Sequence, residues 1–326
     1  INKRFVRVCS LLLVCSLCTI SGTGCGENRL EDAFEADLPG IGIQTSEESS
    51  KIPYFASDLC VTDTDVQDIE ADTEDALAAC FFNLNEKKVL YAKNIHERMY
   101  PASTTKIMTA LVALDKGDLD AQTTVSKEAI TFSESGVSTA KLKEGDVLTL
   151  RQLLYALLTV SANDAANVIA EQIAGSQDAF VEMMNQEAQK IGATNTHFVN
   201  ANGLHSEDHY TTVYDLYLMF NAAMQHEEFL QMLQEKEYQA SYQAADGTTV
   251  EAVWSTTNQF TKGDVTVPDG VTAVGGKTGT TTAAMSCLVQ LFEDAQGEQY
   301  VAIILGCKER GILYQEMQTF LSNLNN

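Results

Sequence analysis

The chain has 326 residues, of which 45% are hydrophobic and 8% aromatic, and this composition can bury one large core or two smaller ones. It therefore indicates a globular protein and excludes a disordered one. The formal net charge of -24 argues against nucleic acid as a partner, because a nucleic-acid-binding face needs clustered lysine and arginine side chains that this sequence lacks.

Residues 1–25 have the layout of a secretory signal peptide. A basic start at residues 3–7 precedes an apolar stretch at residues 8–20, and small residues follow. The apolar stretch is too short and too poorly flanked to predict a membrane-spanning helix. We therefore expect an exported protein.

The end of this segment, Thr23-Gly24-Cys25, resembles a bacterial lipobox, although Gly22 stands where that pattern usually has leucine. The resemblance implies that Cys25 is lipidated and becomes the mature N-terminus. Such a lipid would anchor the protein to the outer face of the cytoplasmic membrane, in the bacterial cell envelope. Cleavage without lipidation and an uncleaved anchor are the alternatives.

Residues 26–75 are rich in aspartate, glutamate, serine and threonine, and contain only two basic residues, Arg29 and Lys51. This composition predicts a solvated acidic linker, which would hold a domain away from a membrane surface. Within it, a short strand is expected around residues 58–61.

Four cysteines, Cys60, Cys80, Cys287 and Cys307, lie beyond Cys25. None belongs to a C-x-x-C pair, so they indicate neither a zinc site nor a redox motif. Disulfides are permitted in an exported protein, but small buried free thiols in strands are an equal alternative.

Residues 76–326 are expected to form the folded domain, with strands near both ends and helices between them. Strands are predicted at residues 76–94, which turn at 85–87, at 237–254, which turn at Asp246-Gly247, and at 272–307, whose last two strands turn near Gln296-Gly297. Helices, from apolar residues spaced three and four apart, are predicted at residues 126–130, 148–175, 177–192, 212–225 and 313–324. This order indicates an α+β domain in which the terminal segments share one sheet.

Three short motifs carry candidate chemistry: Ser103-x-x-Lys106 at a helix start, Ser161-x-Asn163 at the start of a second apolar helix, and Lys277-Thr278-Gly279 on a predicted strand. Alone, Ser103 fits a helix N-cap as well as a nucleophile, because serine is favoured at that position. In this order, and each on the predicted kind of element, the three resemble the S-x-x-K, S-D-N and K-T-G motif set of β-lactamases and penicillin-binding proteins.

With these motifs, residues 76–321 resemble the serine D-alanyl-D-alanine carboxypeptidases, the low-molecular-mass penicillin-binding proteins. The stretch "SANDAA" is close to that family's form of the second motif, and "FVNANGLHSEDHYTTVYDL" resembles another stretch typical of it. The resemblance implies a β-lactamase-like fold, with an antiparallel sheet of about five strands beside a mainly helical subdomain. It also implies removal of the terminal D-alanine from peptidoglycan stem pentapeptides, covalent inhibition by β-lactam antibiotics, and no cofactor.

Ser103 is the expected nucleophile and Lys106 its base. A lysine serves as a base only if burial or a second cation lowers its pKa. Lys106 follows Ser103 by three residues and so lies on the same helical face, and Lys277 would supply the second cation. Amides at a helix start can stabilise the oxyanion, and the family pattern adds the amide after K-T-G, so the expected donors are the amides of Ser103 and Thr280.

The resemblance also assigns the remaining motif residues. It implies that Ser161 relays a proton to the leaving D-alanine and that Asn163 holds the peptide. It implies that Lys277 and Thr278 face the substrate carboxylate, and that Gly279 leaves room for the substrate to lie along the strand as an edge partner.

Two other functions share part of this machinery. A serine β-lactamase should carry a Glu-x-x-x-Asn deacylation loop between the second and third motifs, but none is evident, and Glu182 and Asn185 fall inside a predicted helix. A non-catalytic penicillin-binding sensor or wall-binding module would be expected to have lost an active-site residue. His205 and His209 could suggest a metal site, but no third ligand is in view, so no metal is expected.

Overall fold

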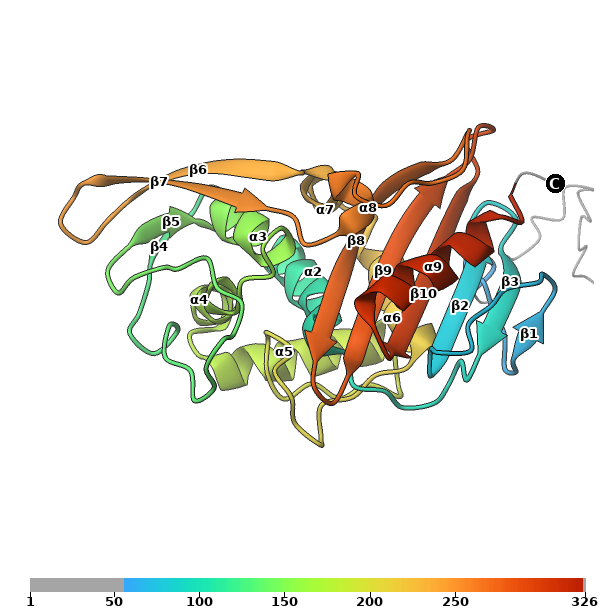
Figure 1. The fold of residues 1–326 in the computed structure, drawn as a ribbon. Coiled ribbons are helices and arrows are strands. Elements are labelled where there is room, and N and C mark those ends of the chain that lie inside the picture. Colours follow the sequence, from blue (N-terminus) through green and yellow to red (C-terminus); the bar gives the residue numbers. More distant parts are fainter. Residues whose placement is uncertain (1–55, 325–326) are drawn as a thin grey trace, which may run out of the picture. The chain divides into compact units, whose positions relative to one another are not determined.

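The computed structural model describes residues 56–324, whose arrangement is shown in Figure 1. The predicted signal peptide, the lipobox at Cys25 and the linker up to residue 55 lie outside the described residues. Within the described part, no helix has the length and apolar character that crossing a membrane requires.

A six-stranded antiparallel sheet, in the order β1-β3-β2-β10-β9-β8, forms the centre of the domain (Figure 1). Its strands are β1 Val66–Gln67, β2 Ala78–Asn83, β3 Lys88–Lys93, β8 Thr272–Thr281, β9 Met285–Glu293 and β10 Gln299–Cys307. β2 pairs with β10, from Ala78 opposite Leu305 to Asn83 opposite Tyr300. This pairing confirms that segments from both ends of the domain share one sheet.

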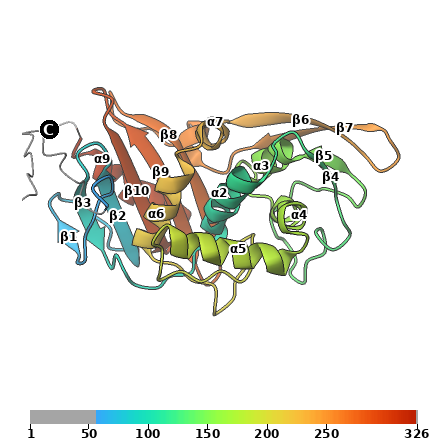
Figure 2. The same ribbon diagram turned by 180° about the vertical axis from the view of Figure 1, so that it is seen from behind.

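Helices cover both faces of this sheet, and further helices form a subdomain beside it. They are η2 Ala102–Thr105, which is a 3-10 turn, α2 Lys106–Lys116, α3 Leu150–Leu158, α4 Asn163–Ala174, α5 Gln177–Lys190, α6 Val213–Ala223, α7 Glu227–Gln234, α8 Gln259–Lys262 and α9 Arg310–Leu321. α9 lies across the face seen in Figure 1, whereas α6 lies against the opposite face, seen in Figure 2. The first eight residues of α2 are all buried, so this helix is the centre of the helical subdomain.

Side chains alternate between two cores along each strand, as the two-residue period of a strand requires. In β10, Val301 and Ile303 face the core that the helical subdomain covers, while Ala302 and Ile304 face the core beneath α9. All four cysteines of the described part are buried free thiols, so the structure favours thiols over the disulfides left open above.

A second antiparallel sheet, in the order β4-β5-β6-β7, lies beside the helical subdomain. Its strands are β4 Gln122–Thr124, β5 Val147–Thr149, β6 Glu237–Gln243 and β7 Thr249–Ser255. β6 and β7 form the predicted hairpin, but β4 and β5 were missed, because three-residue strands leave no periodic pattern. The helix predicted at residues 126–130 is wrong, since the chain forms only an isolated turn there, in which Ser126 Oγ accepts a hydrogen bond from the Ala129 amide.

The folded domain begins before residue 76, where the sequence analysis placed its start. Cys60 is buried, its amide donates a hydrogen bond to the Tyr217 hydroxyl at 2.9 Å, and its carbonyl accepts one from the Tyr214 hydroxyl at 3.0 Å. The short strand is β1, at residues 66–67, rather than at residues 58–61. Hydrogen bonds to α6 therefore hold the last part of the expected linker against the domain. The acidic composition of this segment gave no indication of these contacts.

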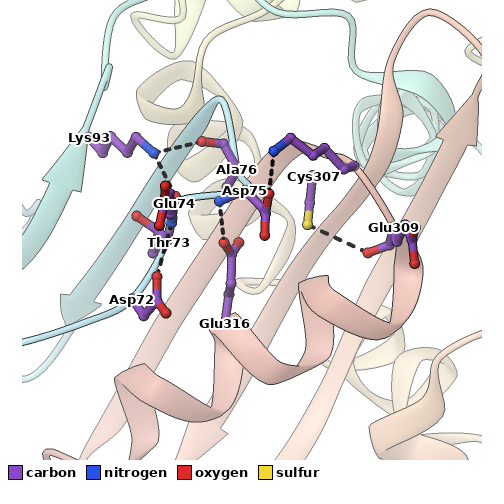
Figure 3. A network of polar contacts seen from close by, with 10 residues as sticks. Asp72, Thr73, Glu74, Asp75, Ala76, Lys93, Cys307, Glu309 and Glu316 are labelled. Carbon is purple, nitrogen blue, oxygen red and sulfur yellow. Dashed lines mark hydrogen bonds and ion pairs between the residues drawn. The ribbon is translucent and has the colours of Figure 1, made fainter.

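Figure 3 shows how the segment just before β2 is fixed. The Asp75 amide donates a hydrogen bond to the Glu316 carboxylate of α9 at 2.7 Å. The Lys93 ammonium of β3 donates to the carbonyls of Thr73 and Ala76 at 2.5 and 2.7 Å. Burial raises the pKa of Glu316. The N-terminal edge of the domain is therefore attached both to the large sheet and to the C-terminal helix.

Candidate active site

The three motifs meet where the edge strand β8 faces the helical subdomain. Ser103 lies in η2 immediately before α2, Ser161 lies just before α4, and Lys277 lies on β8. β8 contacts η2, and Figure 1 shows β8 as the strand of the large sheet closest to α2 and α3. The fold thus brings together three segments that are far apart in the sequence.

Lys106 has the most polar contacts among the motif side chains. Its Nζ lies 3.0 Å from Ser103 Oγ and 2.7 Å from Asn163 Oδ1, and it also contacts the carbonyl oxygen of Asn202. Burial, and then the positive charge of Lys277, lower the pKa of Lys106 well below that of a free lysine. A lysine that is to take a proton from serine needs this lowered pKa.

The oxygens around Lys106 also determine the direction of its hydrogen bonds. A neutral amine has two N–H donors and one lone pair, whereas Asn163 Oδ1 and the Asn202 carbonyl can only accept. When Lys106 is neutral, these two oxygens accept hydrogen bonds from both of its N–H groups. The lone pair of Lys106 Nζ can then accept the hydroxyl proton of Ser103. The arrangement therefore suits proton transfer from Ser103 to Lys106.

Lys277 is the second buried lysine of the site. Its Nζ donates hydrogen bonds to Ser161 Oγ at 2.9 Å and to the carbonyl of Thr278 at 2.8 Å. Burial, together with the positive charge of Arg310 at the start of α9, lowers the pKa of Lys277 to about 7. Lys277 therefore joins the second motif to β8, and Arg310 adds a charge that no sequence motif indicated.

Buried polar groups hold the start of α4 in place. The Asp164 carboxylate accepts hydrogen bonds from the amides of Ala140 and Leu142 at 2.9 and 3.1 Å, and the Asn163 amide donates to the Ser138 carbonyl at 2.8 Å. Burial raises the pKa of Asp164, although the amide hydrogen bonds oppose that effect. Asp164 thus fastens this loop beside the second motif, a role that the sequence analysis did not assign.

Two glycines allow close approach to the turn that carries the first motif. A Cβ atom at Gly279 would lie 3.0 Å from both the Pro101 carbonyl oxygen and the Ser103 amide nitrogen. A Cβ atom at Gly203, where φ is +84°, would overlap the carbonyl of Ala102. Glycine is required at Gly203 and relieves crowding at Gly279, so the space expected at Gly279 for a substrate also lies against the protein's own backbone.

Thr278 has a partner that no motif indicated. Its hydroxyl lies 2.5 Å from the hydroxyl of Thr257, in the loop between β7 and α8, and the Thr257 amide donates to the carbonyl of Thr159 at 3.1 Å. Thr280 lies exposed on β8, one residue beyond Gly279. Only the tertiary contact identifies Thr257 as a residue of the site.

His205 and His209 do not converge on a metal site. His209 is buried and its Nε2 lies 2.8 Å from the Thr105 hydroxyl, whereas His205 packs edge-on against the ring of Tyr100, with centroids 4.7 Å apart. Across residues 56–324, no three or more His, Cys, Asp or Glu side chains gather as metal ligands would.

Comparisons with known proteins show the family to which the chain belongs. Residues 65–309 match the family model of D-alanyl-D-alanine carboxypeptidases. The D-alanyl-D-alanine carboxypeptidase DacF of Bacillus subtilis is 38% identical over 156 residues, which cover 47% of this chain and 40% of that protein. The corresponding DacC of Escherichia coli is 31% identical, with coverage of 78% and 62%, and DacB2 of Mycobacterium tuberculosis is 35% identical, with coverage of 73% and 78%. The chain thus spans less than two thirds of the Bacillus and Escherichia proteins.

Solved structures show the same fold. A Streptomyces DD-transpeptidase has a TM-score of 0.72 and 28% identity, over 78% of this chain and 98% of that chain. The D-alanyl-D-alanine carboxypeptidase from Mycobacterium tuberculosis has a TM-score of 0.69 and 29% identity, over 79% and 95%. These likenesses confirm the expected β-lactamase-like fold. On the family match and the shared fold, the chain belongs to the D-alanyl-D-alanine carboxypeptidase family.

Proposed function

We propose that the chain is a serine D-Ala-D-Ala carboxypeptidase, which removes the terminal D-alanine of peptidoglycan stem pentapeptides through an acyl-enzyme on Ser103. The observation that carries this proposal is the contact of Ser103 Oγ with the buried Lys106, whose other neighbours leave its lone pair for the serine proton. Membership of the family supports the same reaction. β-Lactam antibiotics would acylate the same serine and so inhibit the enzyme covalently.

In the proposed acylation, Ser103 Oγ attacks the carbonyl carbon of the penultimate D-alanine while its proton passes to Lys106 Nζ. The amides of Ser103 and Thr280 stabilise the oxyanion that forms. The C–N bond then breaks, and Ser161, whose Oγ accepts a hydrogen bond from Lys277 Nζ at 2.9 Å, gives its own hydroxyl proton to the amine of the leaving D-alanine. The proton held by Lys106 then restores the Ser161 hydroxyl, so Lys106 is again a neutral base and Lys277 keeps its charge throughout.

Deacylation uses the same base. A water molecule attacks the ester carbonyl and gives a proton to the neutral amine of Lys106. The C–O bond to Ser103 then breaks and the proton on Lys106 passes to Ser103 Oγ. The shortened peptide leaves with a new terminal carboxyl group, which gives its proton to solvent and becomes a carboxylate.

The substrate's terminal carboxylate would bind beside Lys277 and Thr278. Thr257 adds a second hydroxyl there, 2.5 Å from that of Thr278, and Arg310 adds positive potential. Asn163 accepts from Lys106 through Oδ1, so its NH₂ group is the part that would hold the peptide. A cationic and hydroxyl-rich end of the site suits a free carboxylate rather than an internal peptide bond.

The alternatives have less support. A serine β-lactamase needs a Glu and an Asn in a deacylation loop, but Glu182 and Asn185 both lie in α5, and Asn185 exchanges hydrogen bonds of 2.9 and 2.8 Å with the backbone of Phe198. A non-catalytic sensor is expected to lack an active-site residue, but every motif residue is present in this chain.

The proposal is tested by incubating the protein with a peptide that ends in D-Ala-D-Ala, and separately with penicillin. We expect D-alanine release in the first reaction and, in the second, an adduct that mass spectrometry maps to Ser103. An adduct on another residue would contradict the assignment of the nucleophile. Penicillin binding without D-alanine release would favour the sensor.

We further propose that the enzyme acts outside the cytoplasm, anchored to the outer face of the cytoplasmic membrane by lipid on Cys25. The signal-peptide layout and the lipobox-like Thr23-Gly24-Cys25 support this location, and the acidic residues that follow would serve as a tether. The two or three acyl chains of a bacterial lipoprotein bind membranes firmly. Cys25→Ala should change processing and release more soluble protein, whereas a mature N-terminus beyond Cys25 would refute the anchor.

A further inference from the structure

The turn immediately before the proposed nucleophile is strained. Ala102 has φ of +47°, in the left-handed region that residues with a Cβ atom rarely adopt. Such a conformation persists only where surrounding contacts hold it. Because Ala102 precedes Ser103 directly, whatever holds this turn also determines where Ser103 Oγ lies relative to Lys106.

A short chain of hydrogen bonds ends on this strained residue. The Thr105 hydroxyl lies 2.8 Å from the Ala102 carbonyl oxygen and 2.8 Å from Nε2 of His209. The other ring nitrogen of His209, Nδ1, lies 3.1 Å from the amide nitrogen of Val199. The chain therefore runs from the loop around Val199, through His209 and Thr105, to the turn at Ala102.

The donors and acceptors allow only one direction for this chain. The Val199 amide can only donate, so Nδ1 of His209 is the acceptor and Nε2 carries the ring proton. Nε2 donates to Thr105 Oγ1, whose own proton is then free to bond to the Ala102 carbonyl, which can only accept. Each group along the chain is satisfied.

His209 stays neutral, which keeps this direction fixed. Its side chain is buried, and burial, together with smaller effects of the neighbouring basic side chains His197, Lys106 and His205, lowers its pKa to about 3. Over the pH range in which a lysine base works, the ring therefore neither gains a proton nor reverses its hydrogen bonds.

We propose that His209 and Thr105 are positioning residues for the acyl transfer, because together they hold the Ala102 carbonyl and with it the turn that presents Ser103 to Lys106. This inference rests on the proposed function. Neither side chain is assigned a contact with substrate, so both act only through the geometry of the turn. A misplacement of about 1 Å at reacting groups costs about 10²-fold in rate, so a modest shift of this turn is measurable.

Two pairs of variants separate the hydrogen bonds from the packing. Thr105→Val keeps the shape of the side chain but removes the hydroxyl, whereas Thr105→Ser keeps the hydroxyl. His209→Asn keeps an acceptor for the Val199 amide but loses the donor to Thr105, whereas His209→Gln keeps that donor. Thr73→Val is the matched control, because its buried hydroxyl lies 2.7 Å from the Tyr91 hydroxyl in the segment before β2.

The measurement is the acylation rate constant at saturating fluorescent penicillin, with the dissociation constant of the initial complex determined in the same titration. Loss of one hydrogen bond should lower that rate constant by about tenfold in Thr105→Val and His209→Asn. The dissociation constant should change by less than about twofold, and the midpoints of the pH profile should stay those of the wild type. Thr105→Ser and His209→Gln should recover most of the rate, and Thr73→Val should match the wild type.

Three results would overturn the inference while leaving the proposed function intact. The first is an acylation rate in both Thr105→Val and His209→Asn equal to that of Thr73→Val. The second is an equal loss in both members of each pair, which would indicate packing alone. The third is a shifted pH midpoint in His209→Gln, which would make His209 a titrating group. A wild-type protein that is not acylated at Ser103 would instead refute the proposed function itself.

Discussion

Replacing Gly279 by alanine should slow acylation in a protein that still folds. The added methyl carbon would lie 3.0 Å from the Pro101 carbonyl oxygen, 3.0 Å from the Ser103 amide nitrogen and 3.1 Å from the Thr104 amide nitrogen. All three are backbone atoms, so no flexible side chain can move aside. Gly203 packs against the same turn, which limits how far the turn can shift.

The size of the effect follows from these distances. Ordinary contacts of this kind are about 3.5 Å, so β8 and the turn must separate by about half an ångström. Overpacking of a buried contact costs about 1–3 kcal/mol of folding free energy. Because a displacement of about 1 Å at reacting groups lowers rates by about 10²-fold, we expect acylation to slow by about tenfold or more in a protein that still folds.

The assay follows covalent labelling by fluorescent penicillin over time, with urea unfolding as the measure of stability. Gly311→Ala in α9 is the matched control, because a Cβ atom there would have no neighbour within 4 Å and alanine is the better helix former. We expect this control to react at the wild-type rate. If Gly279→Ala is labelled within twofold of the wild-type rate, the close approach of β8 to the turn is not needed, and the reasoning is refuted.

Three further predictions concern the motif residues. Ser103→Ala should abolish D-alanine release and penicillin labelling without changing the urea midpoint, and any residual covalent labelling would point to a different nucleophile. Lys106→Ala should stop acylation even at saturating penicillin, whereas Lys277→Ala should mainly raise KM for the peptide. Equal losses of kcat in the two variants would contradict the assignment of Lys106 as the base and Lys277 as a substrate-binding residue. With increasing pH, kcat/KM should first rise as the buried Lys106 loses its proton, at a pH well below the pKa of a free lysine. It should then fall, with a midpoint near pH 7, as Lys277 loses the charge that attracts the substrate carboxylate. A profile that stays flat up to pH 9 would contradict the assigned role of Lys277.

Many of the strands and helices could be predicted because each has its own local pattern of apolar and polar residues. The hairpins at residues 76–94 and 237–254 and the strands within 272–307 have apolar runs separated by polar turns, and the structure has strands there. The helices α3 to α6 show apolar residues spaced three and four apart. The three-residue strands β4 and β5 and the one-turn helix α8 carry no such pattern, so their existence depends on the neighbours that they pair with or pack against.

The candidate site divides in the same way. The motifs around Ser103, Ser161 and Lys277 could be recognised because their residue types and order repeat across a family. No motif marks Thr257, and the family-like stretch that contains His209 does not indicate its contact with Thr105. Both contacts join residues that are not neighbours in the chain.

The sequence by itself determined which groups can react, since the hydroxyl, amine and amide groups belong to the side chains. Its apolar pattern also determined which helices and strands hold these side chains. Only the tertiary structure decided how those groups behave. The lowered pKa of Lys106 requires burial and the nearby Lys277, and the direction of its hydrogen bonds requires the oxygens of Asn163 and Asn202. Burial and proximity arise only when the edge strand β8 packs against the helical subdomain, because desolvation and Coulomb interactions depend on distances in space and not on separation along the chain.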